Sequence, residues 1–147
     1  MAPTIHHGLL DYGQPWSLPT VKLFTGNPIR RSDGALVMGR GAAQAVRDRW
    51  PTVQYRIPIL PGKHLAWCQI EPDQWIGWFQ VKHHWQQPAC PDLIRASAKA
   101  LAAGASARPG RTFELNAPGV GNGRLSWADV EPLLDVLPSN VHIYLAP

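Results

Sequence analysis

The hydrophobic positions of this chain fall into short runs with two different periods. Four runs are typical of β-strands: Thr20 to Thr25, Tyr55 to Leu60, Arg111 to Leu115 and Val141 to Leu145. Pro58 marks the second run as an edge strand or a bulged one, because proline cannot donate to a strand ladder. Two aromatic-rich segments, His64 to Ile70 and Trp75 to Lys82, flank the turn signal Glu71-Pro72-Asp73-Gln74 and predict an antiparallel hairpin.

Helical spacing, with apolar residues three or four positions apart, appears in three other segments. The first predicted helix follows Gly41, places Ala42, Ala45 and Val46 on one face, and ends at Trp50-Pro51. The second opens with Pro91, which suits a first helical position, and its predicted stop is Gly104. Its buried stripe is Leu93, Ile94, Ser97, Ala98 and Leu101.

Ser126 predicts the cap of a third helix, with Asp129 in the place of the usual Glu. Pro132 removes one backbone donor, so this helix either kinks there or begins its regular part near that residue. Strands and helices therefore alternate along the chain. Such an order favours a three-layer α/β/α domain with a mixed sheet, in which ligands collect where strands pass into helices.

Composition narrows the class of protein. The 147 residues, 45% of them hydrophobic, fit one domain spanning residues 1–147. Fourteen Lys and Arg against ten Asp and Glu give a formal charge of +4, which favours phosphate-bearing ligands or nucleic acid. Cys68 and Cys90 form no disulfide pattern, and no targeting signal or membrane-spanning run appears, so we expect a cytoplasmic protein without membrane contact. The absence of a heptad pattern favours a monomer.

Two glycine-rich loops lead into segments with helical spacing. Val37-Met38-Gly39-Arg40-Gly41-Ala42 precedes the first helix, and Asn116-Ala117-Pro118-Gly119-Val120-Gly121-Asn122-Gly123 precedes the third. Glycine lacks the Cβ that would keep a ligand from the backbone, and a helix N-terminus offers unpaired N–H donors, so the loops predict a socket for a diphosphate. Either loop alone also fits an ordinary turn. The first lacks the third glycine of a dinucleotide-binding fingerprint.

Lys82-His83-His84-Trp85 lies between these loops in the sequence and closes a predicted strand. One interpretation is a solvated surface segment; the other places a cation beside the diphosphate. The histidines have no metal-ligand spacing, and no G-x-S-x-G elbow exists, so we expect neither a metal site nor a serine hydrolase. Asn27 is also a common turn residue, and Trp85 can serve packing or ligand stacking.

Four fragments, taken in order, resemble the loops of macrodomains. They are Thr25-Gly26-Asn27, Val37 to Ala42, Phe79 to Trp85, and Ala117 to Trp127. The closest resemblance is to the DNA ADP-ribosyl glycohydrolase antitoxins of the DarT/DarG type, whose loops read approximately V-M-G-K-G-I-A, F-P-T-K-x-H-W and P-L-G-C-G-N-G-G-L-x-W. It extends over most of the chain, from about residue 20 to residue 145.

The resemblance implies the macrodomain sandwich, with ADP-ribose as the ligand and no cofactor. Lys82 matches the lysine regarded as catalytic in the antitoxins, and Asn27 matches a contact to the distal ribose. The other residues expected to bind the ligand are Val37, Met38, Gly39, Arg40, Gly41, Ala42, His83, Trp85, Pro118, Gly119, Val120, Gly121, Asn122, Gly123 and Arg124.

Two departures from the resemblance concern the ends of the ligand. Macrodomains commonly hold adenine with an Asp soon after the first strand, and here Asp11 is only an offset candidate. The loop between Asn27 and Val37 is longer and more basic than in the antitoxins. Its Arg30 and Arg31 either contact a phosphate or nucleic-acid strand or belong to an ordinary solvated loop.

The function that the resemblance favours is removal of ADP-ribose from a modified macromolecule, with DNA as the preferred substrate. One alternative is a module that binds ADP-ribose, or a related nucleotide, without turning it over. Another is a phosphatase acting on ADP-ribose-1''-phosphate. Lys82 separates the first two, because a module that only binds needs no lysine there; if it reacts, it can serve as an electrophilic donor, a proton shuttle or an attacking amine.

Overall fold

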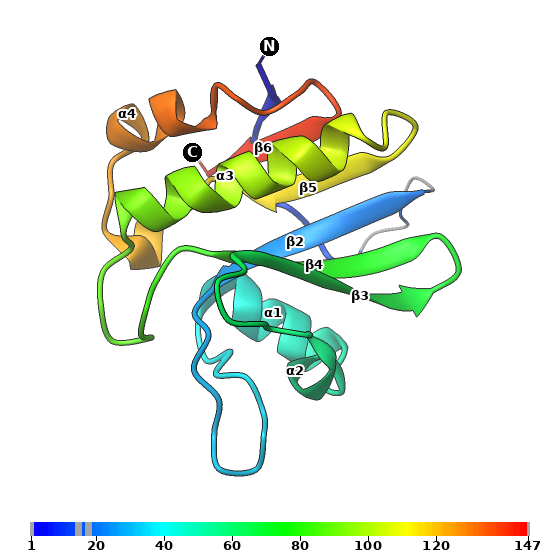
Figure 1. Cartoon of the computed structure of the whole chain (residues 1–147), viewed down its shortest axis with the longest axis vertical. Coiled ribbons are helices and arrows are strands. Elements are labelled where there is room, and N and C mark those ends of the chain that lie inside the picture. Colours follow the sequence, from blue (N-terminus) through cyan, green and yellow to red (C-terminus); the bar gives the residue numbers. More distant parts are fainter. Residues whose placement is uncertain (1, 14–15, 17–18, 147) are drawn as a thin grey trace.

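The computed structural model describes residues 2–13, 16 and 19–146, and its centre is a six-stranded sheet (Figure 1). The strands are β1 (Thr4–His7), β2 (Thr20–Gly26), β3 (Leu65–Glu71), β4 (Gln74–Gln80), β5 (Thr112–Asn116) and β6 (Val141–Leu145). Their order across the sheet is β1-β6-β5-β2-β4-β3. Neighbouring strands are parallel except β3 and β4, which form the predicted antiparallel hairpin at one edge.

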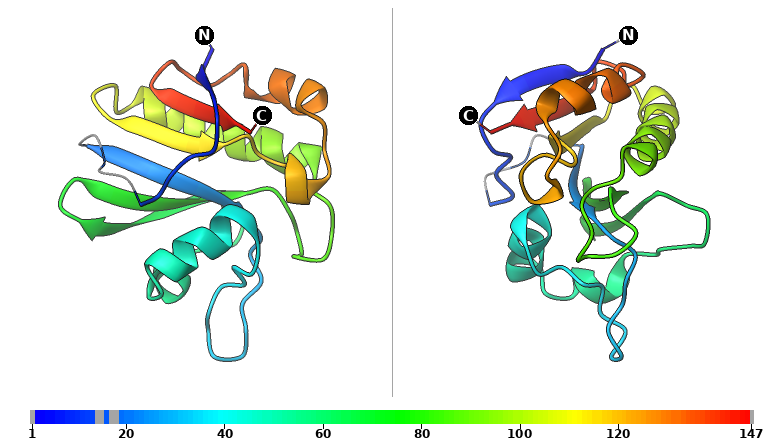
Figure 2. Two further views of the ribbon diagram at one scale, coloured as in Figure 1. Left: turned by 180° about the vertical axis from the view of Figure 1, so that it is seen from behind. Right: turned by 90° about the vertical axis from the view of Figure 1, so that its left-hand side faces the viewer.

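Helices cover both faces of the sheet (Figure 2). They are α1 (Gly41–Arg49), α2 (Val53–Arg56), α3 (Pro91–Ser106) and α4 (Trp127–Val130), with two 3-10 turns, η1 (Gly121–Gly123) and η2 (Glu131–Leu134). One core lies between the sheet and α3, α4 and η2, and a second lies between the sheet and α1 and α2. The three-layer α/β/α arrangement with a mixed sheet is therefore confirmed.

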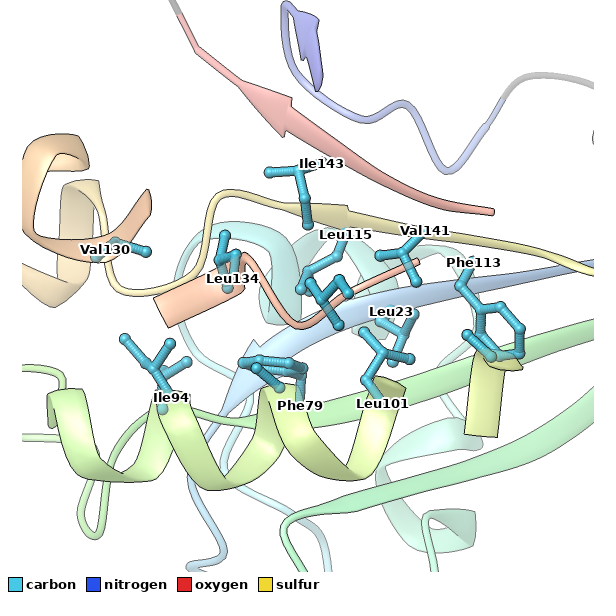
Figure 3. Close-up of a cluster of buried hydrophobic side chains, with 14 of the residues drawn as sticks. Leu23, Phe79, Ile94, Leu101, Phe113, Leu115, Val130, Leu134, Val141 and Ile143 are labelled. Atoms are coloured by element: carbon cyan, nitrogen blue, oxygen red, sulfur yellow. The ribbon is translucent and has the colours of Figure 1, made fainter. Parts of the chain in front are cut away.

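Alternation along each strand divides the side chains between these two cores. In β4, Phe79 packs toward α3, whereas its neighbour Trp78 packs toward α1. Figure 3 shows the α3 core, where Ile94 and Leu101 from the helix meet Leu115 from β5. Each fully buried side chain of this size stabilises the fold by about 1.5–3 kcal/mol, so the sheet is a rigid platform for the loops at its edge.

The predicted strand from Tyr55 to Leu60 is wrong, because its first residues lie in α2. The backbone N–H of Ile57 donates to the carbonyl of Val53, which is a helical hydrogen bond. Val53 and Ile57 are fully buried, while Tyr55 and Leu60 are more than half exposed. Val53 and Ile57 share the buried side of a helical turn while Tyr55, between them, is exposed, whereas in a strand all three would face the same side.

The end of one helix and the presence of one strand also differ from the sequence prediction. The helix that begins at Pro91 continues through Gly104 to Ser106, and Gly104 serves packing instead, because a Cβ there would come within 3.3 Å of the Trp67 ring. The edge strand β1 was not predicted. It pairs with β6, so that Ile5 lies opposite Ile143.

The end of the chain follows the prediction. The Ser126 hydroxyl accepts a hydrogen bond from the backbone N–H of Asp129 and caps α4. The helix changes to the 3-10 turn η2 at Glu131, directly before Pro132, as the missing donor requires. Among the described residues, no helix is long and apolar enough to cross a membrane.

Candidate functional site

A cavity of about 860 Å³ opens where the parallel strands end. Its lining takes residues from the C-terminal ends of β2, β5 and β6 and from the segments that directly follow β1 and β4. These five strands are adjacent in the sheet, so the cavity crosses four strand spacings, or roughly 19 Å at about 4.8 Å per spacing. A cavity of this length suits a ligand with one group at each end and a linker between them.

The two glycine loops meet in the middle of this cavity. A Cβ added to Gly41 would lie 2.9 Å from the side-chain nitrogen of Asn122, so the loops approach each other at these residues. Gly41 has a φ of +57°, and Gly119 and Gly121 have φ values of +79° and +77°, which other residues rarely adopt. Gly41 also begins the nine-residue helix α1, whose first N–H groups have no side-chain cap. This pair of loops offers bare backbone donors to an anion from two sides.

Most of the residues predicted from the sequence lie in the cavity wall. They are Asn27, Val37, Gly39, Arg40, Gly41, Ala42, Lys82, Trp85, Gly119, Val120, Gly121, Asn122 and Gly123. The remaining four lie outside the described lining. Met38 is 1% exposed and packs in the α1 core, Pro118 is buried, and His83 and Arg124 are exposed on the surface.

Lys82 follows β4 and carries an ammonium group at the glycine loops. Its Nζ lies 3.4 Å from the backbone oxygen of Asn122. Burial lowers the pKa of Lys82, and the positive charges of Arg40 and Arg124 lower it further. The lysine therefore lies partly buried among positive charges, which an anionic ligand would neutralise.

The charges of the cavity have one sign. Arg30, Arg31, Arg40 and Lys82 are in the wall, and no Asp or Glu is among the lining residues that the structure describes. Asp11, the candidate for holding adenine, also lies outside that lining, and its carboxylate accepts a hydrogen bond from the N–H of Gly13. A ligand with several negative charges fits this wall best.

Asn27 is both a turn residue and a residue of the cavity wall. Its side-chain oxygen accepts a hydrogen bond from the N–H of Ile29 at 2.9 Å, which closes the turn after β2. The residue is only 6% exposed, and it borders the cavity. The turn fixes the amide at the end of the cavity where β2 and β4 finish.

The opposite end of the cavity is formed by residues that the sequence did not single out as ligand-binding. Leu9 follows β1, and Tyr144, Leu145 and Ala146 come from the end of the chain. Asn116, at the end of β5, accepts a hydrogen bond from the N–H of Leu10 and so ties the segment after β1 to the cavity. Had β1 been predicted as a strand, Leu9 would have been expected in the cavity wall, because β1 carries it to this edge of the sheet.

The arrangement offers no obvious metal centre. Within the described part of the chain, no three His, Cys, Asp or Glu side chains gather in a way that could hold a metal ion. Besides backbone groups, the cavity wall presents guanidinium groups, one amine, side-chain amides and hydroxyls.

Comparison with solved structures identifies the architecture. The macrodomain of Thermus aquaticus DarG superposes with a TM-score of 0.73 at 19% identity, covering 99% of both chains. The macrodomain of Mycobacterium tuberculosis DarG gives 0.70 at 25% identity, covering 98% of this chain and 97% of that one. This chain has the macrodomain fold. The resemblance to macrodomains that the four sequence fragments indicated is therefore confirmed for the fold.

The same macrodomain architecture occurs in Thermosipho africanus DarTG, solved in complex with ADP-ribose. That structure gives a TM-score of 0.67 at 23% identity and covers 87% of this chain, which matches 38% of the longer protein. No family model and no curated protein sequence matches the chain. Structure, more than sequence, connects this chain with the proteins that share its fold.

Proposed function

We propose that this macrodomain binds ADP-ribose in the cavity and hydrolyses the bond that joins ADP-ribose to a modified macromolecule. The observation that carries the proposal is the partly buried Lys82 ammonium at the meeting point of the two glycine loops. The complex of Thermosipho africanus DarTG with ADP-ribose supports the choice of ligand. The shared fold supports ADP-ribose as the class of ligand, and the position of Lys82 supports the reaction.

In this proposal the loops divide the ligand between them. The diphosphate lies between Gly41, where α1 begins without a side-chain cap, and Gly121 of the second loop. The distal ribose lies toward Asn27 and Lys82, at the end formed by β2 and β4. The adenosine lies toward Leu9 and Tyr144, about four strand spacings away.

Lys82 would act on the bond at the distal ribose. A lowered pKa leaves a larger fraction of its side chain as the neutral amine at neutral pH, which supports a role as proton shuttle or attacking amine. Once a diphosphate binds, its negative charge favours the ammonium form, which supports a role as electrophilic donor. These roles predict different pH dependences of turnover.

DNA is the preferred carrier of the ADP-ribose in this proposal. The mouth of the cavity presents Arg31 and Arg40, and Trp85 is 42% exposed beside it. Guanidinium groups attract a phosphate backbone, and an exposed indole offers a stacking surface for a base. The loop between Asn27 and Val37, which carries Arg31, is held in place by Arg30. The guanidinium of Arg30 donates to the carbonyls of Gly34, Gln54 and Ile57.

Release of free ADP-ribose tests the proposal. The protein is incubated with an ADP-ribosylated single-stranded oligonucleotide and, separately, with an ADP-ribosylated protein, and the product is measured by chromatography. We expect the wild-type protein to release ADP-ribose from the oligonucleotide and Lys82→Ala to release none. The affinity of Lys82→Ala for ADP-ribose should fall by less than about tenfold, roughly 1.4 kcal/mol. Equal turnover by Lys82→Ala would remove this lysine from the reaction. Binding of ADP-ribose without release from either substrate would leave a module that only binds.

A further inference from the structure

Gln80 is the last residue of β4 and lies two positions before Lys82. Its side chain is 6% exposed, so both ends of its amide need partners inside the protein. The amide oxygen lies 2.9 Å from Nδ1 of His64, and the amide nitrogen donates to the backbone oxygen of Lys82 at 3.1 Å. The side chain therefore bridges the start of the β3 hairpin and the peptide group of the lysine.

The direction of these hydrogen bonds follows from the chemistry of the groups. The Lys82 carbonyl can only accept, so the nitrogen of the Gln80 amide faces it and the oxygen faces His64. His64 must then carry a proton on Nδ1, whether its ring is neutral or charged.

The backbone of Gln80 is fixed independently of its side chain. Gln80 lies opposite Gly26 of β2, its N–H donates to the carbonyl of His64, and its carbonyl accepts from the hydroxyl of Ser97 on α3. The amide of Gln80 thus projects from a rigid support. It reaches the first peptide group beyond the end of the regular strand.

Lys82 itself is held weakly by other contacts. Its N–H lies 3.4 Å from the carbonyl of Gly26, and its Nζ lies 3.4 Å from the carbonyl of Asn122, both long for such bonds. The bond from Gln80 at 3.1 Å is the shortest of these three. After Lys82 the chain continues into exposed residues, beginning with His83.

We propose that Gln80 is a positioning residue, whose amide fixes the peptide of Lys82 so that the amine faces the meeting point of the two glycine loops. This inference rests on the proposed reactivity of Lys82. It assigns Gln80 no contact with the ligand, because the residue is not among the described residues of the cavity wall. Loss of the amide frees the Lys82 carbonyl to turn toward solvent and carries the side chain away from the loops.

Two substitutions separate the halves of the amide. Gln80→Glu keeps the size and the acceptor for His64 but, as a carboxylate, cannot donate to the Lys82 carbonyl. Gln80→Met keeps the length of the side chain and removes both hydrogen bonds. Asn140→Ala is the matched control, because it also removes a side-chain amide that donates to backbone carbonyls, and Asn140 precedes β6, at the end of the sheet away from the cavity.

The first measurement is turnover of the ADP-ribosylated oligonucleotide. We expect both Gln80 variants to lose at least tenfold in kcat with KM changed less than threefold, because the ligand contacts remain. Asn140→Ala should unfold at a lower temperature and keep its kcat within about twofold. Gln80→Met with wild-type kcat would overturn the proposal.

The second measurement does not need turnover. Labelling of Lys82 by acetic anhydride, followed across pH by mass spectrometry, reports the pKa of its amine, and the chain has only three other lysines to distinguish, Lys22, Lys63 and Lys99. The wild-type amine should have a pKa below the usual lysine value, and Gln80→Met, which adds no charge, should shift it upward as the amine reaches solvent. An unchanged pKa in folded Gln80→Met would contradict the positioning role.

The two measurements also separate this inference from the proposed function. If the wild-type protein releases no ADP-ribose, the proposed hydrolysis fails, and the labelling result still decides whether Gln80 positions Lys82. If the wild type turns over and the Gln80 variants match it in both measurements, the hydrolysis stands and the positioning role fails.

Discussion

Replacement of Gly41 by alanine tests whether the two glycine loops act together on one ligand. Gly41 begins α1 with a φ of +57°, and an added Cβ would lie 2.9 Å from the side-chain nitrogen of Asn122. Asn122 is exposed, so its side chain can move aside. The substitution therefore combines backbone strain with displacement of the opposite loop.

The magnitude of each effect follows from this geometry. A left-handed conformation costs a non-glycine residue about 1–2 kcal/mol, and the reduced freedom of the unfolded chain returns about 0.4–1 kcal/mol. A net loss of about 1 kcal/mol lowers the unfolding temperature by roughly 2–4 °C in a domain of this size. Displacement of the second loop should weaken ADP-ribose binding at least about tenfold, or roughly 1.4 kcal/mol.

Calorimetric titration with ADP-ribose and thermal unfolding measure the two effects separately. Gly34→Ala is the matched control, because Gly34 has a φ of +89°, has no atom within 4 Å of an added Cβ, and lies outside the described cavity lining. We expect it to lose similar stability and no affinity. If Gly41→Ala binds ADP-ribose within twofold of the wild type, the loops do not grip the ligand between them.

Three further predictions address the mouth of the cavity, helix α2 and the edge of the sheet. Trp85→Ala should weaken binding of the ADP-ribosylated oligonucleotide by about 1–3 kcal/mol and leave free ADP-ribose binding unchanged, and equal losses for both ligands would refute base stacking. Ile57→Ala should lower the free energy of unfolding in urea by about 2–5 kcal/mol, while Tyr55→Ala should change it by about 0.5 kcal/mol or less; comparable losses would contradict the helical turn. Burial, then His6, lowers the folded-state pKa of His142 below 6.5, so the unfolded chain binds the proton more readily and stability should fall as pH drops below about 6.5. His142→Gln should flatten this part of the stability profile in urea titrations, and an unaltered slope would exclude His142 as its source.

The sequence predicted the central part of the site because the relevant signals are local. Glycine marks the loops at Gly41 and Gly119, and helical spacing shows that each loop leads into a helix. Parallel strands end at one edge of a sheet, so loops that follow different strands are brought together there. The position of Lys82 followed from the same rule, since it comes directly after β4.

The far end of the cavity was not predictable in this way. β1 has four residues with two histidines among them, too short and too polar for a periodic signal. It gains its place by pairing with β6, almost the whole chain away, where His6 stacks on Tyr144 with ring centroids 4.6 Å apart. Long-range pairing of this kind carries Leu9 into the wall and leaves no trace in a local window.

The error at α2 has a different cause. In the predicted strand from Tyr55 to Leu60, Tyr55, Ile57 and Ile59 fall on alternate positions, which matches the period of a strand. The structure exposes Tyr55 and buries Ile57 together with Val53, which lies four positions earlier and before the predicted run, so the effective spacing is four residues. Packing on the face of the sheet selected between two periods that so short a run cannot distinguish.

Calorimetric titration of the wild-type protein with ADP-ribose tests the central claim most directly, because every proposed role inherits this ligand. We predict saturable one-to-one binding of ADP-ribose. AMP, which lacks the diphosphate and the distal ribose, should bind with lower affinity. Absence of measurable heat with ADP-ribose at millimolar concentration, or equal affinity for AMP, would contradict a diphosphate held between the two glycine loops.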